Sequence, residues 1–369
     1  METLALFFMI FLQNMKHSII VGLGLAGLNY ALQLQKEKKD FFIIDTGIKN
    51  ASRNAAGICN PTVLKRYTMS WYGSEFIEYA LPHYRSFESK INESFYQDLP
   101  IHKYFNRTSE QNDWSIASHK KELNKFLEPQ ITNNSNPGIK RKNGYGSVQN
   151  VGRLEVSLIL NRFTKNLLAT EYLNEALDYD SLEIEDNHVI YKGIVAQQIV
   201  FCEGYGLKKN PWFNYLPLKG SKGEYFLIKA PKLSRKQIVK GGVFILPMGT
   251  DLFWVGASFS SDDKTNEKTE KGKKWLLSKL ENLLDTPYEI IYHGASIRPT
   301  VSDRRPLLGE HPIHKNLYIF NGLGTRGVLM APLLSKWLYD FISEKKELPQ
   351  AVAINRFETY FSSPKKKHV

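Results

Sequence analysis

Cysteine is scarce in this sequence, which has only two, Cys59 and Cys202, among its 369 residues. Neither belongs to a Cys-x-x-Cys motif, so the sequence excludes a disulfide framework and a zinc site built from cysteines. Isolated cysteines are typical of a reducing compartment, and we therefore predict a cytoplasmic protein.

The sequence also lacks an apolar run long enough for a transmembrane helix. The run from Leu4 to Leu12 is well short of the roughly 20 residues that a helix needs to span a bilayer. Glu2 stands where a secretory signal would be basic, and a predicted strand at Lys16 leaves no room for a cleavage site. We predict no membrane span, Met15 as the natural start, and residues 1–14 as a non-native or unstructured extension.

Acidic residues are outnumbered, 37 against 49 Lys and Arg, so the formal net charge is +12. Such a balance attracts anionic ligands, acidic substrates or RNA. Most of the basic residues are dispersed, with local runs at 140–142 and at 365–367 inside a predicted disordered basic tail, 362–369. We interpret both runs as solvated surface and do not favour nucleic-acid binding over this interpretation.

Glycines are placed where a predicted strand turns into a predicted helix. Gly22, Gly24 and Gly27 form a G-x-G-x-x-G sequence after an apolar run, and the next apolar run, 41–44, ends at Asp45. Strand, glycines, helix, strand and acid in this order are the dinucleotide-binding fingerprint. The alternative is a glycine-rich turn in another α/β protein.

Each residue of this motif has a predicted role. We expect Gly22 to make the tight turn, Gly24 to let a pyrophosphate approach the backbone, and Gly27 to let the helix pack closely on the strand. The pyrophosphate would lie at the helix N-terminus, where the dipole favours negative charge. Asp45 would accept hydrogen bonds from the ribose, and the turn also contains Leu23 and Ala26.

Three further segments have the small residues expected beside a flat ligand. They are Ser52-Arg53-Asn54-Ala55-Ala56-Gly57, the turn at Gly204 that follows an apolar strand ending at Cys202, and Gly322-Leu323-Gly324-Thr325-Arg326-Gly327. The last one again stands between a strand, 317–321, and a helix that runs to about residue 342. We predict that the two strand–glycine–helix units hold the two ends of one ligand.

The middle of the chain predicts a different kind of sheet. Apolar residues alternate in short runs at 224–229, 242–247, 252–257 and 288–297, with a charged helix at about 267–284 and an earlier helix at 154–168. These strands favour an antiparallel sheet in a second lobe.

On these motifs the chain resembles the D-amino-acid-oxidase-type family of FAD-dependent oxidoreductases, which includes glycine oxidase and sarcosine oxidase. The resemblance also includes Arg298-Pro299, Asp303, Pro306 and Gly309, and it extends over almost the whole chain. The C-terminal block is also similar to the oxidase half of the bifunctional enzyme that modifies tRNA wobble uridine. The methyltransferase half of that enzyme has no counterpart in this sequence.

The resemblance implies an α/β fold with a Rossmann-like FAD-binding domain of the glutathione-reductase type and an inserted α+β substrate lobe on an antiparallel sheet. We assign residues 16–90, 145–215 and 295–345 to the FAD-binding domain. Residues 91–144 and 216–294 form the substrate lobe.

The resemblance also implies a chemistry. FAD would take a hydride from a carbon next to an amine, and oxygen, a quinone or another electron carrier would reoxidise it. We expect noncovalent FAD, because 303–309 contains no cysteine. Predicted cofactor-binding residues are Gly22, Leu23, Gly24, Ala26, Gly27, Asp45, Ser52, Ala56, Gly57, Gly204, Gly322, Gly324, Thr325, Arg326 and Gly327.

Three basic residues are candidates for the substrate site. The guanidinium of Arg298 suits a substrate carboxylate, the alternative being a structural pair with Asp303 or another acid. Arg326 either stabilises the reduced ring or is a surface arginine, and Lys222 is a second substrate-binding candidate. No metal site is predicted.

The preferred function is oxidation of the C–N bond of a small carboxylated amino acid or secondary amine. The alternatives are an oxidase of the carboxymethylaminomethyl group on tRNA and a flavin-binding subunit of a dehydrogenase complex without turnover of its own. A nicotinamide-dependent dehydrogenase would leave the second glycine turn unexplained.

Overall fold

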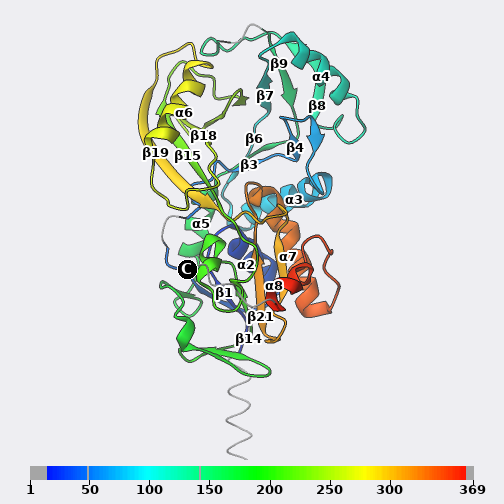
Figure 1. The fold of residues 1–369 in the computed structure, drawn as a ribbon, viewed down its shortest axis with the longest axis vertical. Coiled ribbons are helices and arrows are strands. Elements are labelled where there is room, and N and C mark those ends of the chain that lie inside the picture. Colours follow the sequence, from blue (N-terminus) through cyan, green and yellow to red (C-terminus); the bar gives the residue numbers. More distant parts are fainter. Residues whose placement is uncertain (1–14, 48–49, 141–142, 363–369) are drawn as a thin grey trace, which may run out of the picture.

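The computed structural model describes residues 15–47, 50–140 and 143–362. The predicted extension at 1–14 and the tail after Ser362 lie outside the described residues. Two large sheets occupy opposite ends of the long axis (Figure 1). The lower sheet contains the strands that precede the predicted glycine turns, and the upper sheet is formed mainly by the middle of the chain.

The first sheet contains the two predicted strand–glycine–helix units. Its central strand β1 is buried along almost its whole length, as expected for a parallel strand covered on both faces. Parallel pairs join β2 to β1, β1 to β14 and β14 to β21, so their carboxyl ends meet at one edge. The strands are β1 (Lys16–Val21), β2 (Phe41–Ile44), β11 (Tyr172–Leu173), β12 (Leu182–Ile184), β13 (Val189–Tyr191), β14 (Ile194–Phe201), β20 (Leu307–Glu310) and β21 (Leu317–Asn321).

The second sheet is antiparallel except for the β16–β7 pair, and its order is β19-β15-β18-β17-β16-β7-β9-β8. Its strands are β7 (Ile101–Tyr104), β8 (Leu127–Thr132), β9 (Tyr145–Val148), β15 (Ser221–Lys229), β16 (Ile238–Lys240), β17 (Phe244–Pro247), β18 (Leu252–Gly256) and β19 (Glu289–Arg298). Strand β9 pairs with β7 and β8 here, although we had assigned residues 145–148 to the cofactor domain. The division into domains otherwise stays a prediction.

Helices and small sheets fill the space between and around the two sheets. The helices are α2 (Leu25–Lys36), α3 (Gly73–Ile91), α4 (Thr108–Ser118), α5 (Val156–Lys165), α6 (Glu270–Glu281), α7 (Gly327–Glu344) and α8 (Glu358–Ser362), with 3₁₀ turns at Tyr179–Ser181, Gly204–Lys209 and Ile354–Phe357. Short strands are β3 (Ile58–Cys59), β10 (Gly152–Leu154) and β6 (Tyr96–Asp98) in one sheet, and β4 (Thr62–Val63) with β5 (Thr68–Met69) in another.

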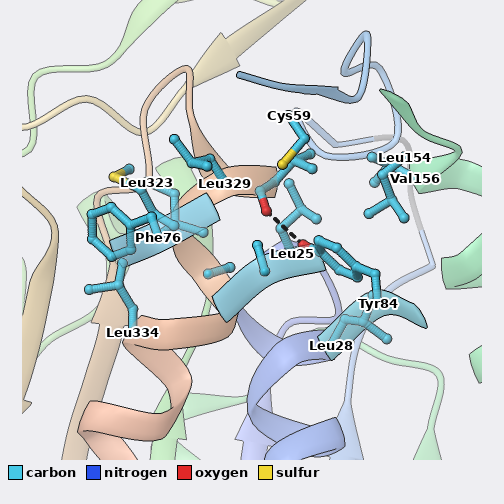
Figure 2. Packing of buried hydrophobic residues seen from close by; sticks show 14 of the residues in the cluster. Leu25, Leu28, Cys59, Phe76, Tyr84, Leu154, Val156, Leu323, Leu329 and Leu334 are labelled. Carbon is cyan, nitrogen blue, oxygen red and sulfur yellow. Dashed lines mark hydrogen bonds between the residues drawn. The ribbon is translucent and has the colours of Figure 1, made fainter. Parts of the chain in front are cut away.

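The helices that follow the two glycine turns lie side by side (Figure 1). Leu25, at the start of α2, and Leu329, in the first turn of α7, belong to one buried cluster (Figure 2). Tyr84 of α3 joins them, because its hydroxyl donates a hydrogen bond to the Val328 carbonyl at 2.8 Å. Segments 300 residues apart therefore meet in a single core.

The second sheet has two different faces, which follow from the period of two in a strand. Phe226, Ile228 and Val255 pack with Leu276 and Leu280 of α6 on the outer face. The alternate residues Tyr225, Leu246 and Trp254 belong instead to the large cluster that includes α2 and α7. We call this second face the inner face.

Gly27 gives a direct test of the helix–strand contact. A Cβ on Gly27 would lie 2.0 Å from the Gly22 carbonyl oxygen, so Gly27→Ala forces the helix away from the turn. We expect this substitution to lower the free energy of unfolding by about 1–3 kcal/mol or more. Urea denaturation of the flavin-free protein measures it.

Gly206→Ala is the matched control. A Cβ at Gly206 meets nothing nearer than 3.4 Å, so the control should remain within about 0.5 kcal/mol of the parent. Equal stability of Gly27→Ala and the parent would contradict the packing described above.

Candidate functional site

The first glycine turn is shaped by backbone contacts as well as by its predicted ligand. Gly22 has φ +95°, and a Cβ there would lie 2.8 Å from the carbonyl oxygen of Cys202 at the end of β14. Gly24 is the N-cap residue of α2, which has no side-chain cap from this position. Leu23 and Ala26 are buried beside these glycines. The turn thus lies at the carboxyl edge of the sheet, against β14.

Asp45 is buried and faces the turn. Its two carboxylate oxygens accept hydrogen bonds from the backbone N–H of Leu23 and of Gly47, each at 2.9 Å. Each carboxylate oxygen has a further lone pair that a ribose hydroxyl can use. The sequence alone does not predict this second role of Asp45, closing the turn, because the role depends on which N–H groups face the carboxylate.

Ser52 meets the N-terminus of α2. Its hydroxyl accepts a hydrogen bond from the Leu25 N–H at 3.0 Å, and a Cβ on Gly24 would lie 2.9 Å from the same oxygen. The first-turn N–H groups of a helix lack intrahelical acceptors, so the hydroxyl completes a polar rim around this end of α2. The segment predicted to lie beside the ligand therefore contacts the glycine turn directly.

Ala56 and Gly57 continue this segment. Ala56 packs against the large core cluster, and Gly57 has φ +82°. A Cβ on Gly57 would lie 2.0 Å from the carbonyl oxygen of Leu154, so packing on β10 already requires glycine here. A contact of Gly57 with a cofactor stays a prediction.

Gly204 lies just beyond β14 with φ +56°, and no atom within 4 Å would contact a Cβ on it. Its carbonyl oxygen accepts a hydrogen bond from the Asn321 side-chain amide at 3.0 Å. Asn321 is the last residue of β21, so this hydrogen bond joins the ends of β14 and β21.

The second glycine turn leads into α7. Gly322 and Gly324 have φ values of +76° and +55°, and Thr325 between them and the helix is exposed. Gly327 begins α7, and a Cβ on it would lie 3.0 Å from Leu25 Cδ1 of α2. The N-termini of the two helices are therefore direct neighbours, which is the arrangement that a ligand bound at both turns requires.

Arg326 is not a free surface arginine. Its guanidinium donates hydrogen bonds to the carbonyl oxygens of Asn60 (2.7 Å) and Thr62 (3.2 Å), and burial lowers its pKa. It joins the start of α7 to the segment after Gly57. The interpretation as a surface arginine is wrong, while a role toward a flavin ring stays a prediction.

Arg298 ends β19 on the inner face of the second sheet. Its guanidinium covers Gly223 of β15, where a Cβ would lie 1.8 Å from Nη2. Burial lowers the pKa of Arg298, and no carboxylate among residues 15–47, 50–140 and 143–362 forms an ion pair with it. Asp303, the acid that we considered as its partner, instead pairs with Arg356 at 2.9 Å.

Lys222 occupies the opposite face of β15. Its side chain is 1% exposed, and its ammonium pairs with Asp263 at 2.5 Å and donates a hydrogen bond to the Thr265 hydroxyl at 3.3 Å. The hydrogen bond from Lys222 is the main cause that lowers the pKa of Asp263 to about 2. The ion pair favours a structural role for Lys222, and its contact with a substrate stays a prediction.

The inner face has two polar groups that the sequence analysis did not single out. The Tyr225 hydroxyl donates a hydrogen bond to Asn54 Oδ1 at 3.1 Å, which links the second sheet to the 52–57 segment. The Trp254 ring stacks on Tyr225, and its buried Nε1 has no acceptor in the described part of the chain. Strand alternation around Tyr225 was the available signal for this face.

These residues fit a dinucleotide of the FAD type. Glycine turns that a Cβ would obstruct, a carboxylate at the end of β2 and two adjacent helix N-termini match a pyrophosphate and a ribose. The inner face supplies the Arg298 guanidinium, which has no ion-pair partner in the described part of the chain. The next residue, Pro299, accepts a hydrogen bond from the Gly324 N–H of the second glycine turn at 3.0 Å. Among the described residues, no group of three or more His, Cys, Asp or Glu side chains is arranged to hold a metal ion.

In the part of the chain that the structure describes, no helix is both long enough and apolar enough to span a membrane.

The sequence is similar to those of known proteins. The model of the DAO family, FAD dependent oxidoreductase, matches residues 17–341. Glycine oxidase of Geobacillus kaustophilus is 27% identical over 129 residues, which is 34% of each chain. The tRNA 5-methylaminomethyl-2-thiouridine biosynthesis bifunctional protein MnmC of Marinobacter nauticus is 24% identical over 221 residues, 54% of this chain and 35% of that protein. The matches thus span about a third of these curated relatives.

Solved structures share the fold over nearly the whole chain. Glycine oxidase from Geobacillus kaustophilus superposes with a TM-score of 0.74 at 18% identity, covering 93% of this chain and 98% of the other. Iminodiacetate oxidase from Chelativorans sp. BNC1 has the same TM-score at 17% identity, covering 92% and 98%. The predicted α/β fold class is confirmed.

Asp45→Ala tests the predicted ribose contact. A hydrogen bond to a charged group contributes about 1.5–3 kcal/mol, so we expect FAD affinity to fall roughly 10- to 100-fold. Fluorescence titration of the flavin-free protein with FAD measures this change. Asp186→Ala, which removes an exposed acid from the turn between β12 and β13, should leave the affinity unchanged. Equal affinities of the two variants would refute the assignment.

Proposed function

Because this chain belongs to the DAO family of FAD-dependent oxidoreductases, we propose that it oxidises the C–N bond of a small amino acid or secondary amine that carries a carboxylate. FAD, when bound, supplies the acceptor for the hydride that leaves the carbon next to nitrogen. The unpaired guanidinium of Arg298 is the observation on which the choice of substrate rests.

The residues around the two glycine turns would hold FAD. Asp45 would bind the ribose, and the N-terminus of α2 with Ser52 would bind the pyrophosphate. The N-terminus of α7, held by Arg326 against the 60–62 backbone, would lie toward the flavin ring. Gly204, where a Cβ would meet no atom within 4 Å, would leave space for the cofactor at the end of β14, whereas a Cβ on Gly322 would lie 2.7 Å from the Val301 side chain.

Arg298 would bind and orient the substrate. A planar guanidinium makes two parallel hydrogen bonds to a carboxylate, which fixes the position and the rotation of the bound amine. A buried cation without an acid is costly, and a carboxylate ligand removes that cost. Orientation of the donor carbon then accounts for much of the rate acceleration.

The proposed substrate amine binds in its neutral form, so hydride loss needs no strong side-chain base. Its nitrogen lone pair forms the C=N bond as the hydride departs, and water hydrolyses the product to an amine and an oxo acid. Tyr225, tied to Asn54, and the unpaired Trp254 N–H would line this space.

A second candidate is the carboxymethylaminomethyl group of tRNA wobble uridine. It is supported by the similarity to several MnmC proteins, although the matches cover only 25%, 35% and 32% of three of them. This group is itself a carboxylated secondary amine, so Arg298 would serve it in the same way. A flavin-binding subunit without turnover is the alternative of another class; its flavin would not be bleached by any amine.

We propose oxygen or a quinone-type carrier as the electron acceptor. A reducing compartment such as the cytoplasm suits the two cysteines, which are both free and buried.

Arg298→Leu tests the carboxylate contact. Removing the guanidinium should lower kcat/KM for a carboxylated amine about 100-fold or more, mainly through KM, while the flavin absorption spectrum stays unchanged. Steady-state kinetics with sarcosine and a panel of N-alkylglycines measures it. Arg235→Leu, an exposed arginine, is the control. Kinetics that remain unchanged in Arg298→Leu would defeat the proposal.

Noncovalent attachment of FAD is tested by acid precipitation. Burial raises the pKa of the Cys59 thiol to about 12 and that of Cys202 well above its usual range, so neither thiol forms the thiolate needed for a flavin bond. We expect the yellow colour to stay in the supernatant. A yellow protein pellet would show a covalent link.

A further inference from the structure

Lys240 is a second cation on the inner face, in the same cross-strand row as Tyr225. In register, Lys240 of β16 lies opposite Phe244 of β17, Phe244 opposite Gly256 of β18, and Gly256 opposite Tyr225 of β15. Directly opposite residues of paired strands point to the same side of a sheet. Lys240 therefore shares its side with Tyr225 and Arg298.

The position of the Lys240 ammonium agrees with this register. Nζ lies 4.5 Å from the centroid of the Phe244 ring, so the side chain leans along the row toward Tyr225. It is half-buried, and within the described ranges no carboxylate forms an ion pair with it. An aromatic ring compensates only part of the cost of burying a cation.

Two other lysines of this sheet, Lys103 and Lys222, each form an ion pair with an acidic residue, unlike Lys240. Lys103 of β7 lies directly opposite Lys240, and its ammonium pairs with Glu110 of α4 at 2.7 Å. Lys222 pairs with Asp263 on the other face. In the described part of the chain, Lys240 and Arg298 share one face of this sheet and form no ion pair with an acid, so both are available to the negative charges of a ligand.

The separation of the two cations follows from the sheet. The Arg298 guanidinium covers Gly223 of β15, two residues before Tyr225. Phe244 belongs to β17, which is separated from β15 by β18. Two strand spacings and two residue steps put the charged heads on the order of 12 Å apart. One small carboxylate cannot contact both.

We propose that Lys240 is a specificity-determining residue that binds a second anionic group of the substrate, at the far end of an extended secondary amine whose carboxylate contacts Arg298. This inference rests on the proposed function and narrows its substrate class. The ligand has two negative charges about 6–12 Å apart, with the oxidisable nitrogen beside the carboxylate. Glycine and sarcosine lack the second anionic group.

The pKa of Lys240 adds a condition. Burial, together with the charge of Lys103, lowers it to about 8. The ammonium is therefore charged below that pH and neutral above it, so its contribution to anion binding should fade as the pH rises through about 8. Lys103, the charged neighbour that acts on this pKa, is itself paired with Glu110.

The test uses N-(ω-sulfonatoalkyl)glycines with about two to eight methylene groups, and N-alkylglycines of the same lengths. Affinity is measured by calorimetry on the dithionite-reduced holoenzyme, which cannot accept a hydride. At the best length, the sulfonate should bind roughly 10- to 100-fold more tightly than its alkyl counterpart below pH 8. Lys240→Met should abolish this gain, whereas Lys240→Arg should keep it and extend it above pH 8.

Lys236→Met, an exposed lysine before β16, is the matched control and should keep the gain. Equal affinities of sulfonate and alkyl ligands at every length would overturn the inference. It would also be overturned if Lys240→Met weakened the binding of the sulfonate ligands and of the alkyl ligands by the same factor. Turnover of the N-alkylglycines by the oxidised enzyme is scored separately. Its absence would contradict the proposed function, while the binding data would still decide the role of Lys240.

Discussion

The contact between the N-termini of α2 and α7 is the constraint on which the rest of this structure depends. Gly27 allows α2 to touch the Gly22 carbonyl, and Gly327 allows α7 to approach Leu25. Both helices then direct their unpaired N–H groups and positive dipole ends at the same edge of the first sheet. At that edge, the side chains of Asp45 and Ser52 accept hydrogen bonds from the backbone of the first turn. Arg326, at the start of α7, donates a hydrogen bond to the Asn60 carbonyl oxygen.

The second sheet places a different chemistry above this edge. Its outer face is an ordinary apolar core with α6, whereas its inner face combines aromatic rings with Arg298 and Lys240. The same sheet neutralises Lys222 and Lys103 with nearby acids. Because a buried cation without a partner is costly, the contrast between the two pairs of basic residues separates structural charges from charges available to a ligand.

Much of this arrangement could be predicted from the sequence, because its signals are local. The glycine spacing, the acid after β2 and the second strand–glycine–helix unit predicted a dinucleotide-binding fold. The resemblance to a family of FAD-dependent oxidoreductases implied the cofactor, and the family match confirms that family. The contacts that depend on distant segments could not be predicted. Gly57 must be glycine because of its contact with Leu154, and Arg326 is held by the carbonyl oxygens of Asn60 and Thr62. Strand β9 pairs with β7 and β8, one on each side of it. Lys240 was overlooked because its side of the sheet depends on the register of four strands.

The central claim is that a carboxylated amine held on the inner face delivers a hydride to FAD bound at the two helix N-termini. Anaerobic titration of the purified holoenzyme with carboxylated secondary amines, followed at the visible flavin band, measures this most directly. The account predicts stoichiometric bleaching of the flavin and its recovery on admitting the acceptor. A fully loaded, yellow protein whose flavin is bleached by none of these amines would contradict it.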